Sequence, residues 1–504
     1  MNQALGTLQT IRDFAGTRQT VGLDDATIER FLDLDPNLAN AIADAGRIHK
    51  ALQAEYGELL AGDESDAAAF LQSDFVNFYP ANTVNPYISM AAAGPWIITS
   101  HGAVLHDNGG YGMLGAGHSP RAIMDIMGDT HVMANVMTPN FTHKRFATLL
   151  KAEVGQTRGS CPFSKFICMN SGSESVTVAF RIADVNAKHH TEPSGPRAGA
   201  AIKILSLSGS FHGRTDRPAQ ASDSCLGKYK THLASHAANN NLITVPPNDV
   251  EALRKAFAQA EADGVFIELM LIEPVMGEGD PGLACSREFY DAARALTKAH
   301  GSLLLVDSIQ AGLRGSGYLS IIDYPGFQTA EEPDLETYSK ALNAGQYPLS
   351  VLACNERAAN LYVRGIYGNT MTTNPRALAV GCAVLEALTP ELRANIQDRG
   401  QDFLDGLNGL MEGMPELVLK VQGTGLLFSA ELHPAIEVVG FEGIETWLRK
   451  NGLGVIHGGE NSLRFTPHFA ITKAEVDLII HLVRDAILAF SDLVTDSPAQ
   501  AASK

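Results

Sequence analysis

The sequence predicts an α/β fold built on a mostly parallel sheet that is covered by helices. Short apolar runs recur after about residue 160, and they have the length and composition of buried strands. Helical stretches such as residues 286–301 fall between some of these runs, as parallel strands require. With 504 residues, the chain is also long enough for two or more domains with a large buried core.

Five apolar runs are the clearest expected strands, and a further short strand precedes Lys340. The five runs are residues 164–170, 201–207, 264–272, 302–307 and 349–354. In sheets of this kind, ligands bind at the carboxyl ends of the strands. The residues that follow each run are therefore the first candidates for a functional site.

The two ends of the chain differ from this middle part. Residues 1–75 are rich in Ala, Leu, Asp and Glu with helical spacing, and Asp24 and Asp25 are plausible N-caps. We expect this helical extension to pack against the main body or a dimer mate. After about residue 390 the pattern indicates a small set of strands, followed by an amphipathic helix near 471–490.

Composition excludes several classes of protein. The formal net charge of -18 argues against a nucleic-acid partner or an anionic membrane surface. No apolar run approaches the roughly 20 residues that span a bilayer, and the N-terminus shows no secretory signal pattern. The six cysteines are scattered without CxxC spacing, so no metal site or disulfide framework is indicated. A reduced, cytoplasmic setting is the expectation.

The run MNSGSES places Ser171, Gly172 and Ser173 between the end of a strand and the start of a helix. Backbone N–H groups at a helix start, with a serine hydroxyl beside them, suit a phosphate group. Gly172 lets the backbone approach such a ligand closely. By itself, a turn of this kind more often has only a structural role.

Asp307 ends the strand 302–307, where a buried carboxylate is costly unless a cation pairs with it. The protonated ring nitrogen of pyridoxal phosphate (PLP) is such a cation, and holding it protonated makes the ring a stronger electron sink. A helix N-cap or a local salt bridge is the alternative for Asp307 alone.

Lys340 follows a predicted strand and precedes a glycine-containing turn. Lysine is the side chain that forms a Schiff base with a carbonyl group. A single lysine carries little information, but the phosphate-binding turn, Asp307 and Lys340 occur in this order, each at a strand end. Together they indicate PLP as the cofactor, with Lys340 and Asp307 as the catalytic residues.

The same segments resemble the class III aminotransferases, the group of ornithine, acetylornithine and 4-aminobutyrate aminotransferases. The resemblance runs from about residue 95 to about residue 490. It rests on eight ordered motifs: GYGMLGAGHSP, NSGSES, SFHGRT, IEPVMGEGD, LLLVDSIQAG, YSKAL, YGNTMTTNP and SLRFTPHFAIT. It implies PLP-dependent transferase fold type I, with a mostly parallel seven-stranded sheet in a large domain and a smaller α+β domain.

The expected domain organisation follows from this resemblance. It comprises a helical N-terminal extension (1–75), an N-terminal segment of the small domain (76–140), a large PLP-binding domain (141–390), a C-terminal small domain (391–492) and a flexible tail (493–504).

The resemblance also implies roles for residues around the cofactor. Phe211 stacks on the ring and Val275 packs on its opposite face, while Gln310 lies near the phenolic oxygen. The other implied cofactor residues are His212 beside Phe211, Glu273 at a strand end, and Thr370, which reaches the phosphate in the neighbouring subunit. The functional unit is therefore expected to be a homodimer or a dimer of dimers.

Three charged residues are implied in substrate binding. Arg464 matches the family arginine that binds an α-carboxylate. Glu278 matches the glutamate that pairs with that arginine when an ω-amino donor is bound, and Arg214 matches the arginine that holds a distal carboxylate. Two arginines suit a dicarboxylate acceptor such as 2-oxoglutarate.

The chain also departs from the family pattern. Ser308 stands where the family usually has the glutamate of DEVQ, Met276 where it more often has glutamine, and Asn343-Ala344-Gly345 where it has three glycines. These departures indicate a divergent subgroup and leave the amino donor open.

The function that the resemblance implies is a ping-pong transfer of an amino group, from an ω-amino donor to 2-oxoglutarate. Two other PLP functions stay open: decarboxylation or intramolecular amine transfer on the same fold, and a transaminase that uses α-amino acids with pyruvate. A non-catalytic binding protein is the remaining alternative, and the presence of Lys340 and Asp307 argues against it.

Overall fold

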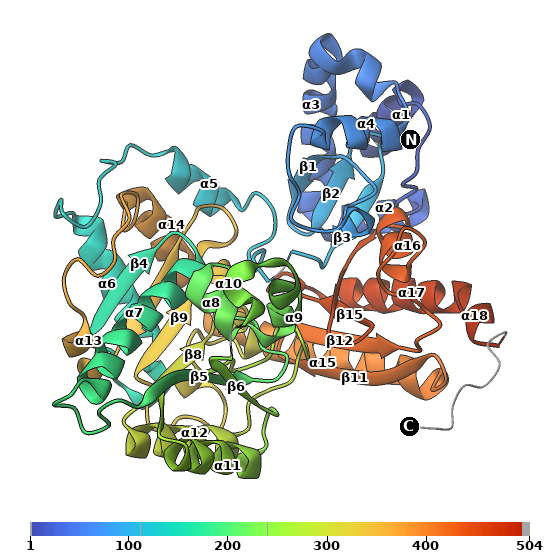
Figure 1. Ribbon diagram of the computed structural model, residues 1–504. Coiled ribbons are helices and arrows are strands. Elements are labelled where there is room, and N and C mark those ends of the chain that lie inside the picture. The colour runs from blue at the N-terminus through green and yellow to red at the C-terminus, as the bar shows by residue number, and fades with distance from the viewer. Residues whose placement is uncertain (1–2, 111, 239, 496–504) are drawn as a thin grey trace. The chain divides into compact units, whose positions relative to one another are not determined.

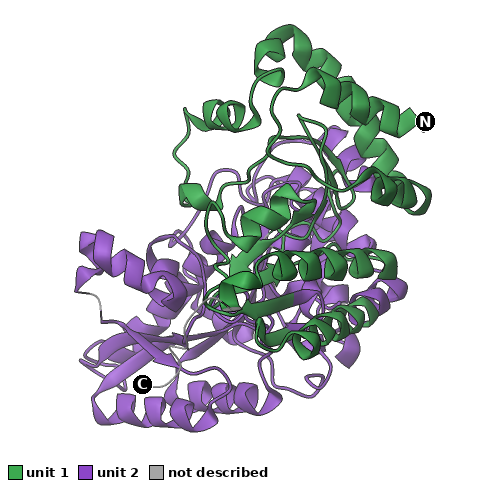
Figure 2. Ribbon diagram, turned by 90° about the vertical axis from the view of Figure 1, so that its right-hand side faces the viewer, with its two compact units in different colours: residues 1–120, 398–422, 428–504 green, residues 121–397, 423–427 purple. Residues whose placement is uncertain are grey.

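The computed structural model describes residues 3–110, 112–238 and 240–495 (Figure 1). The chain divides into two compact units, which Figure 2 colours separately. Unit 1 comprises residues 1–120, 398–422 and 428–504, and unit 2 comprises residues 121–397 and 423–427. Each unit is described by itself below.

Unit 2 contains a seven-stranded sheet with the strand order β4-β10-β9-β8-β7-β5-β6. The pairs β5–β6, β5–β7, β7–β8 and β8–β9 are parallel, and β10 is antiparallel to both β4 and β9. The strands are β4 (Lys165–Met169), β5 (Ala201–Leu207), β6 (Leu242–Val245), β7 (Val265–Ile272), β8 (Leu303–Asp307), β9 (Leu335–Tyr338) and β10 (Ser350–Cys354). The predicted α/β class and all five predicted runs are confirmed, while β6 was not predicted.

Helix α7 (Gly172–Thr191) packs against the middle of this sheet. Its apolar residues Val176 and Phe180 belong to one buried core cluster with Leu305 of β8 and Leu335 of β9. Helices α11 (Val250–Ala262) and α12 (Arg287–His300) also contact the sheet, through β7 and β8. Because side chains alternate along a strand, Asp307 lies on the same face of β8 as Leu305.

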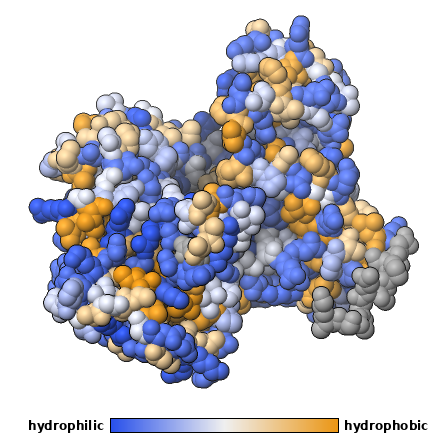
Figure 3. Space-filling view, in the orientation of Figure 1, coloured by the Kyte–Doolittle hydropathy of each residue, from blue (hydrophilic) through white to orange (hydrophobic). Residues whose placement is uncertain are grey.

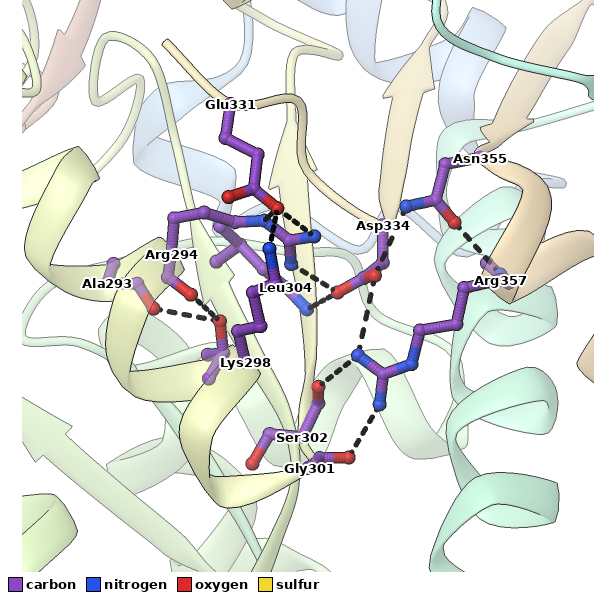
Figure 4. A network of polar contacts seen from close by, with 12 residues as sticks. Ala293, Arg294, Lys298, Gly301, Ser302, Leu304, Glu331, Asp334, Asn355 and Arg357 are labelled. Atoms are coloured by element: carbon purple, nitrogen blue, oxygen red, sulfur yellow. Dashed lines mark hydrogen bonds and ion pairs between the residues drawn. The ribbon is translucent and has the colours of Figure 1, made fainter.

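The start of β9 is fixed by a buried ion-pair network, which Figure 4 shows in detail. Asp334, which is fully buried, accepts a hydrogen bond of 2.8 Å from Arg294 and one of 3.0 Å from the backbone N–H of Leu304. Asn355 donates to the same carboxylate at 3.2 Å, and the Arg357 guanidinium lies 3.5 Å from it. The network ties β9 to α12 and to the start of β8, so that β9 has a fixed position at this end.

Unit 1 begins with the helices α1 (Gln3–Phe14), α2 (Asp25–Leu34), α3 (Pro36–Leu60) and α4 (Glu64–Gln72). Asp24 is the N-cap of α2, as predicted, and its side chain accepts a 2.8 Å hydrogen bond from the Thr27 N–H. Apolar side chains such as Phe31 and Ile42 share a buried cluster with Trp96 and Val104 of the first small sheet. This part of the N-terminal region is therefore packed onto a sheet of its own unit.

Two four-stranded sheets complete the fold. The first has the order β1-β2-β3-β13, and the second has the order β11-β12-β15-β14. Their strands are β1 (Ser89–Ala93), β2 (Trp96–Thr99), β3 (Val104–Asp107), β11 (Val418–Thr424), β12 (Leu427–Leu432), β13 (Leu453–Gly454), β14 (Ile456–Gly458) and β15 (Ser462–Phe465).

The last long helix of unit 1 is α17 (Lys473–Ala489), close to the predicted range. Its capping glutamate, Glu475, also contacts two histidines, His106 at 3.0 Å and His468 at 2.8 Å. Of the tail predicted as flexible, residues 493–495 belong to α18 (Asp492–Thr495), and residues 496–504 lie outside the described residues.

Figure 3 shows hydrophilic residues over much of the visible face, with hydrophobic residues in small patches between them. Among the described helices, none is both long and apolar enough to cross a membrane.

Candidate active site

The phosphate-binding turn predicted at residues 171–173 is a helix N-terminus in the structure. Ser171 is the N-cap of α7, and it forms a capping box with Glu174. The Ser173 hydroxyl accepts a 3.3 Å hydrogen bond from the Arg214 N–H. A side chain on Gly213 would place its Cβ 2.3 Å from the same hydroxyl, so only glycine fits there. The turn therefore lies directly against the SFHGRT segment.

Asp307, at the carboxyl end of β8, is held by three donors. His212 Nδ1 lies 2.9 Å from one carboxylate oxygen, and the other oxygen accepts from Thr337 Oγ1 at 3.0 Å and from the Ile309 N–H at 3.2 Å. Asp307 is 5% exposed and His212 is 2% exposed. The carboxylate thus has a fixed orientation inside the protein.

Lys340 follows β9 at the start of a short 3₁₀ turn, Lys340–Asn343. Its φ angle is 47°, in the left-handed region that residues other than glycine seldom adopt. Such strain persists only where the surroundings enforce it, and it concentrates at functional sites. The Lys340 amine donates a 3.1 Å hydrogen bond to Gln310 Oε1.

A chain of polar contacts joins Lys340 to the SFHGRT segment. Gln310 Nε2 donates to the Gly277 carbonyl at 3.2 Å, and the Gly277 N–H donates to Glu273 at 3.0 Å. The other oxygen of Glu273 accepts from the Phe211 N–H at 3.1 Å. Burial raises the pKa of Glu273 to about 7. These contacts bring residues from four separate sequence motifs into one cluster.

Arg214, from the same segment as Phe211, is exposed. Its guanidinium lies 5.3 Å from the centroid of the Phe211 ring, a cation–π distance. One of its nitrogens also lies 3.4 Å from the Tyr229 hydroxyl.

Four further predicted residues are Val275, Glu278, Thr370 and Arg464. Val275 is fully buried, two residues after Glu273, and Glu278 is half-buried in the same loop. Thr370 is exposed in the loop after α13 (Glu356–Leu361), where its carbonyl accepts a 3.3 Å hydrogen bond from Asn135. Arg464 belongs to unit 1, where it is buried on β15.

Thr337 is the residue of this site that the sequence did not reveal. It pairs with Asp307 because β8 and β9 run parallel with these two residues in register. The only available signal was the position of Thr337 three residues before Lys340 on a short predicted strand.

Comparison with known proteins identifies the family. The family model described as aminotransferase class-III matches residues 78–487. The chain therefore belongs to the class III aminotransferases. Within this family it is 31% identical over 332 residues to an acetylornithine aminotransferase of Thermosynechococcus vestitus, a match that covers 65% of this chain and 75% of the relative. It is 25% identical over 424 residues to a putrescine aminotransferase of Pectobacterium atrosepticum, with 81% and 84% covered.

Solved structures show the same fold. The ornithine aminotransferase from Toxoplasma gondii aligns with a TM-score of 0.72 at 22% identity, covering 88% of this chain and 99% of that one. An acetylornithine aminotransferase from Elizabethkingia anophelis aligns with a TM-score of 0.67 at 22% identity, covering 85% and 100%. The predicted class III aminotransferase, with fold type I and PLP as its cofactor, is thereby confirmed.

The residues present fit PLP. His212 Nε2 is buried without a hydrogen-bond partner among the described residues, as a group facing a ligand site can be. The first turn of α7 offers backbone N–H groups to a phosphate, and the carboxylate of Asp307 suits a protonated ring nitrogen. The Lys340 amine suits an aldehyde.

Proposed function

We propose that this aminotransferase moves an amino group from an ω-amino donor to 2-oxoglutarate by a ping-pong mechanism. Relatives of this chain are named as aminotransferases of acetylornithine, ornithine or putrescine, and each of these substrates carries an amine at the end of its chain. The exposed Arg214 guanidinium over Phe211 supports a dicarboxylate acceptor, because it offers a cation for a second carboxylate.

The observation that carries the assignment of site residues is the chain of contacts from Lys340 through Gln310 and Glu273 to Phe211. In this proposal Lys340 binds the cofactor's aldehyde carbon, and Asp307 holds a proton on the ring nitrogen. The other proposed cofactor contacts are the phosphate at Ser171, Gly172 and Ser173, the ring faces at Phe211 and Val275, and the phenolic oxygen near Gln310.

Bound PLP supplies an aldehyde for the donor amine and a ring that withdraws electrons from the reacting carbon. The residues of the chain do the rest. After its release from the cofactor, the Lys340 Nζ carries a proton away from the donor carbon, as a general base. His212 and Thr337 keep Asp307 oriented during this transfer, because they bind both of its oxygens.

Arg464 and Glu278 are proposed to adapt the site to its two substrates. Arg464 binds the carboxylate next to the amine of glutamate, or next to the keto group of 2-oxoglutarate. Glu278 pairs with Arg464 when an ω-amino donor, which has no carboxylate at that position, is bound. An unpaired buried guanidinium would otherwise cost several kcal/mol.

We further propose a homodimer in which Thr370 contributes to the neighbouring subunit's phosphate site. Thr370 is exposed and lines a hollow of about 600 Å³ together with Met137 and Tyr362. The adjoining segment exposes large apolar side chains, with Met137 83% and Phe141 95% exposed. Exposed apolar residues of this size favour a protein interface.

The substrate assignment is tested with a panel of donors: lysine, ornithine, 4-aminobutyrate, aliphatic diamines and α-amino acids, each with 2-oxoglutarate or pyruvate as acceptor. We expect turnover with a terminal-amine donor and 2-oxoglutarate, and bleaching of the cofactor absorbance when the donor alone is added. Turnover only with α-amino acids and pyruvate would favour a transaminase specific for those two substrates. Release of carbon dioxide would favour a decarboxylase, and an isomerised product formed without any acceptor would favour intramolecular amine transfer.

The dimer is tested by sedimentation of the wild type and Phe141→Asp. We expect a dimer for the wild type and dissociation of the variant, because a charge would be placed in the apolar contact. A wild type that sediments as a monomer while it transaminates would refute the role of Thr370.

A further inference from the structure

The strongest unexplained feature of unit 2 is the buried carboxylate of Glu336, on the strand that leads to Lys340. Glu336 is 0% exposed and forms no ion pair with any described residue. It is one residue before Thr337, so its side chain leaves β9 on the opposite face from the Thr337–Asp307 contact. A buried carboxylate without a cation is costly, so its hydrogen bonds call for an explanation.

Four donors converge on Glu336. Its Oε1 accepts from Ser308 Oγ at 2.6 Å and from the Ile321 N–H at 3.0 Å. Its Oε2 accepts from Ser320 Oγ at 2.5 Å and from the Tyr338 hydroxyl at 3.0 Å. Ser308, Ser320 and Tyr338 are each almost completely buried. Both oxygens of the Glu336 carboxylate therefore accept hydrogen bonds, and all four donors are hydroxyl or amide groups inside the protein.

Ser308 gives this network its connection to the site. It directly follows Asp307, and the Ser308 N–H donates to the Thr337 carbonyl at 3.1 Å. Asp307 and Ser308 thus contact β9 through side chains on both faces: Asp307 through Thr337, and Ser308 through Glu336. The two bonds together leave the end of β8 little freedom to rotate or to slide along β9.

We propose that Ser308 and Glu336 form a positioning pair, which fixes the carboxylate of Asp307 relative to the strand that carries Lys340. The proposal rests on the proposed roles of Asp307 and Lys340. It also accounts for the departure of this chain from the family pattern at residue 308. The carboxylate that the pattern places beside Asp307 lies instead on the neighbouring strand, at Glu336, and Ser308 contacts it.

Two variants of matched chemistry test the pair. Ser308→Ala and Ser320→Ala each remove one buried hydroxyl that donates to the carboxylate of Glu336, but only Ser308 is the direct chain neighbour of Asp307. For Ser308→Ala we expect kcat to fall about tenfold with an unchanged KM for 2-oxoglutarate, since small misplacements of reacting groups cost this much or more. For Ser320→Ala we expect kcat and KM within about twofold of the wild type.

A second readout does not depend on turnover. The visible circular dichroism of bound PLP reports how the cofactor is held, and it is measured on all variants after PLP saturation. We expect a weaker or shifted band for Ser308→Ala and the wild-type band for Ser320→Ala. Glu336→Gln should resemble the wild type, because its oxygen still accepts from Ser308 while the Ser320 and Tyr338 hydroxyls turn to accept from its amide.

The outcomes separate this inference from the proposed function. If Ser308→Ala and Ser320→Ala behave alike in both kcat and the PLP band, the pair serves stability only and the inference is wrong. That result would leave the donor and acceptor assignment untouched. A wild type that turns over none of the tested donors would instead reject the proposed substrates, and the comparison of PLP bands would still decide the role of Ser308.

Discussion

Replacing Glu273 by glutamine probes a buried proton at the candidate active site. Glu273 is 4% exposed, and its two oxygens accept hydrogen bonds from the Phe211 and Gly277 N–H groups. Burial raises its pKa from an ordinary value of 4.5 to about 7; nearby His212 opposes this rise and Asp307 adds to it. At roughly 1.4 kcal/mol per pKa unit, this difference is worth about 3 kcal/mol of unfolding free energy.

The sign of the effect follows from which state binds the proton. Between about pH 4.5 and about pH 7, folded Glu273 keeps a proton that the unfolded chain has lost. The unfolding free energy of the wild type therefore decreases as the pH rises through this window, and it levels off above it. Glutamine cannot ionise, so the variant should gain up to about 3 kcal/mol relative to the wild type on going from about pH 5 to about pH 8.

The assay is urea unfolding of the PLP-bound proteins over this pH range. Burial also raises the pKa of Glu268 and of Glu336 to about 7, but both residues remain in the variant and their effects cancel in the comparison. Glu268→Gln is the matched control: it should show a similar relative gain with pH and leave the PLP absorbance unchanged. If the unfolding free energies of the wild type and Glu273→Gln instead change equally with pH, then Glu273 is ionised throughout this range and its burial does not hold a proton.

Four further outcomes are expected. Lys340→Ala should lose turnover, and borohydride reduction of the wild type should leave the pyridoxyl mass on the peptide that contains Lys340; a label on another lysine contradicts the assignment. Asp307→Ala should retain some PLP but lose most activity, whereas a kcat near that of the wild type would show that another group holds the ring nitrogen. In single-turnover measurements, Glu278→Ala should raise the activation free energy of the ω-amine half-reaction by about 1–3 kcal/mol and spare the glutamate half-reaction. Arg464→Ala should instead lose the glutamate half-reaction. Equal losses in both half-reactions of Glu278→Ala would speak against the proposed pairing of Glu278 with Arg464. Asp334→Asn should destabilise the protein by about 1–3 kcal/mol in urea unfolding, because Arg294 loses its buried carboxylate partner and keeps only the more exposed carboxylate of Glu331, and should keep the kcat of the PLP-bound fraction. Unchanged stability would show that the network in Figure 4 contributes little.

Much of the large sheet and of the site could be predicted from local sequence. The apolar runs of β7 and β8 are buried along their whole length, so composition alone marked them as strands. Asp307 and Lys340 were found because each lies at or just after a strand end, where parallel sheets bind ligands. By contrast, β6 was missed because its run, Leu242–Val245, has only four residues and is shorter than each of the predicted runs.

Strand composition, glycine turns and reactive side chains are local properties, so they predict the fold class, the cofactor and the order of the site residues. The side chains that orient Asp307 depend instead on contacts between segments that are distant in the chain. Thr337 lies 30 residues after Asp307, and Glu336 lies 28 residues after Ser308. Their contacts depend on the register between β8 and β9, and a shift by one residue would turn each side chain to the opposite face of the sheet. That register is set by long-range packing and backbone pairing across the whole sheet, which no short stretch of sequence contains.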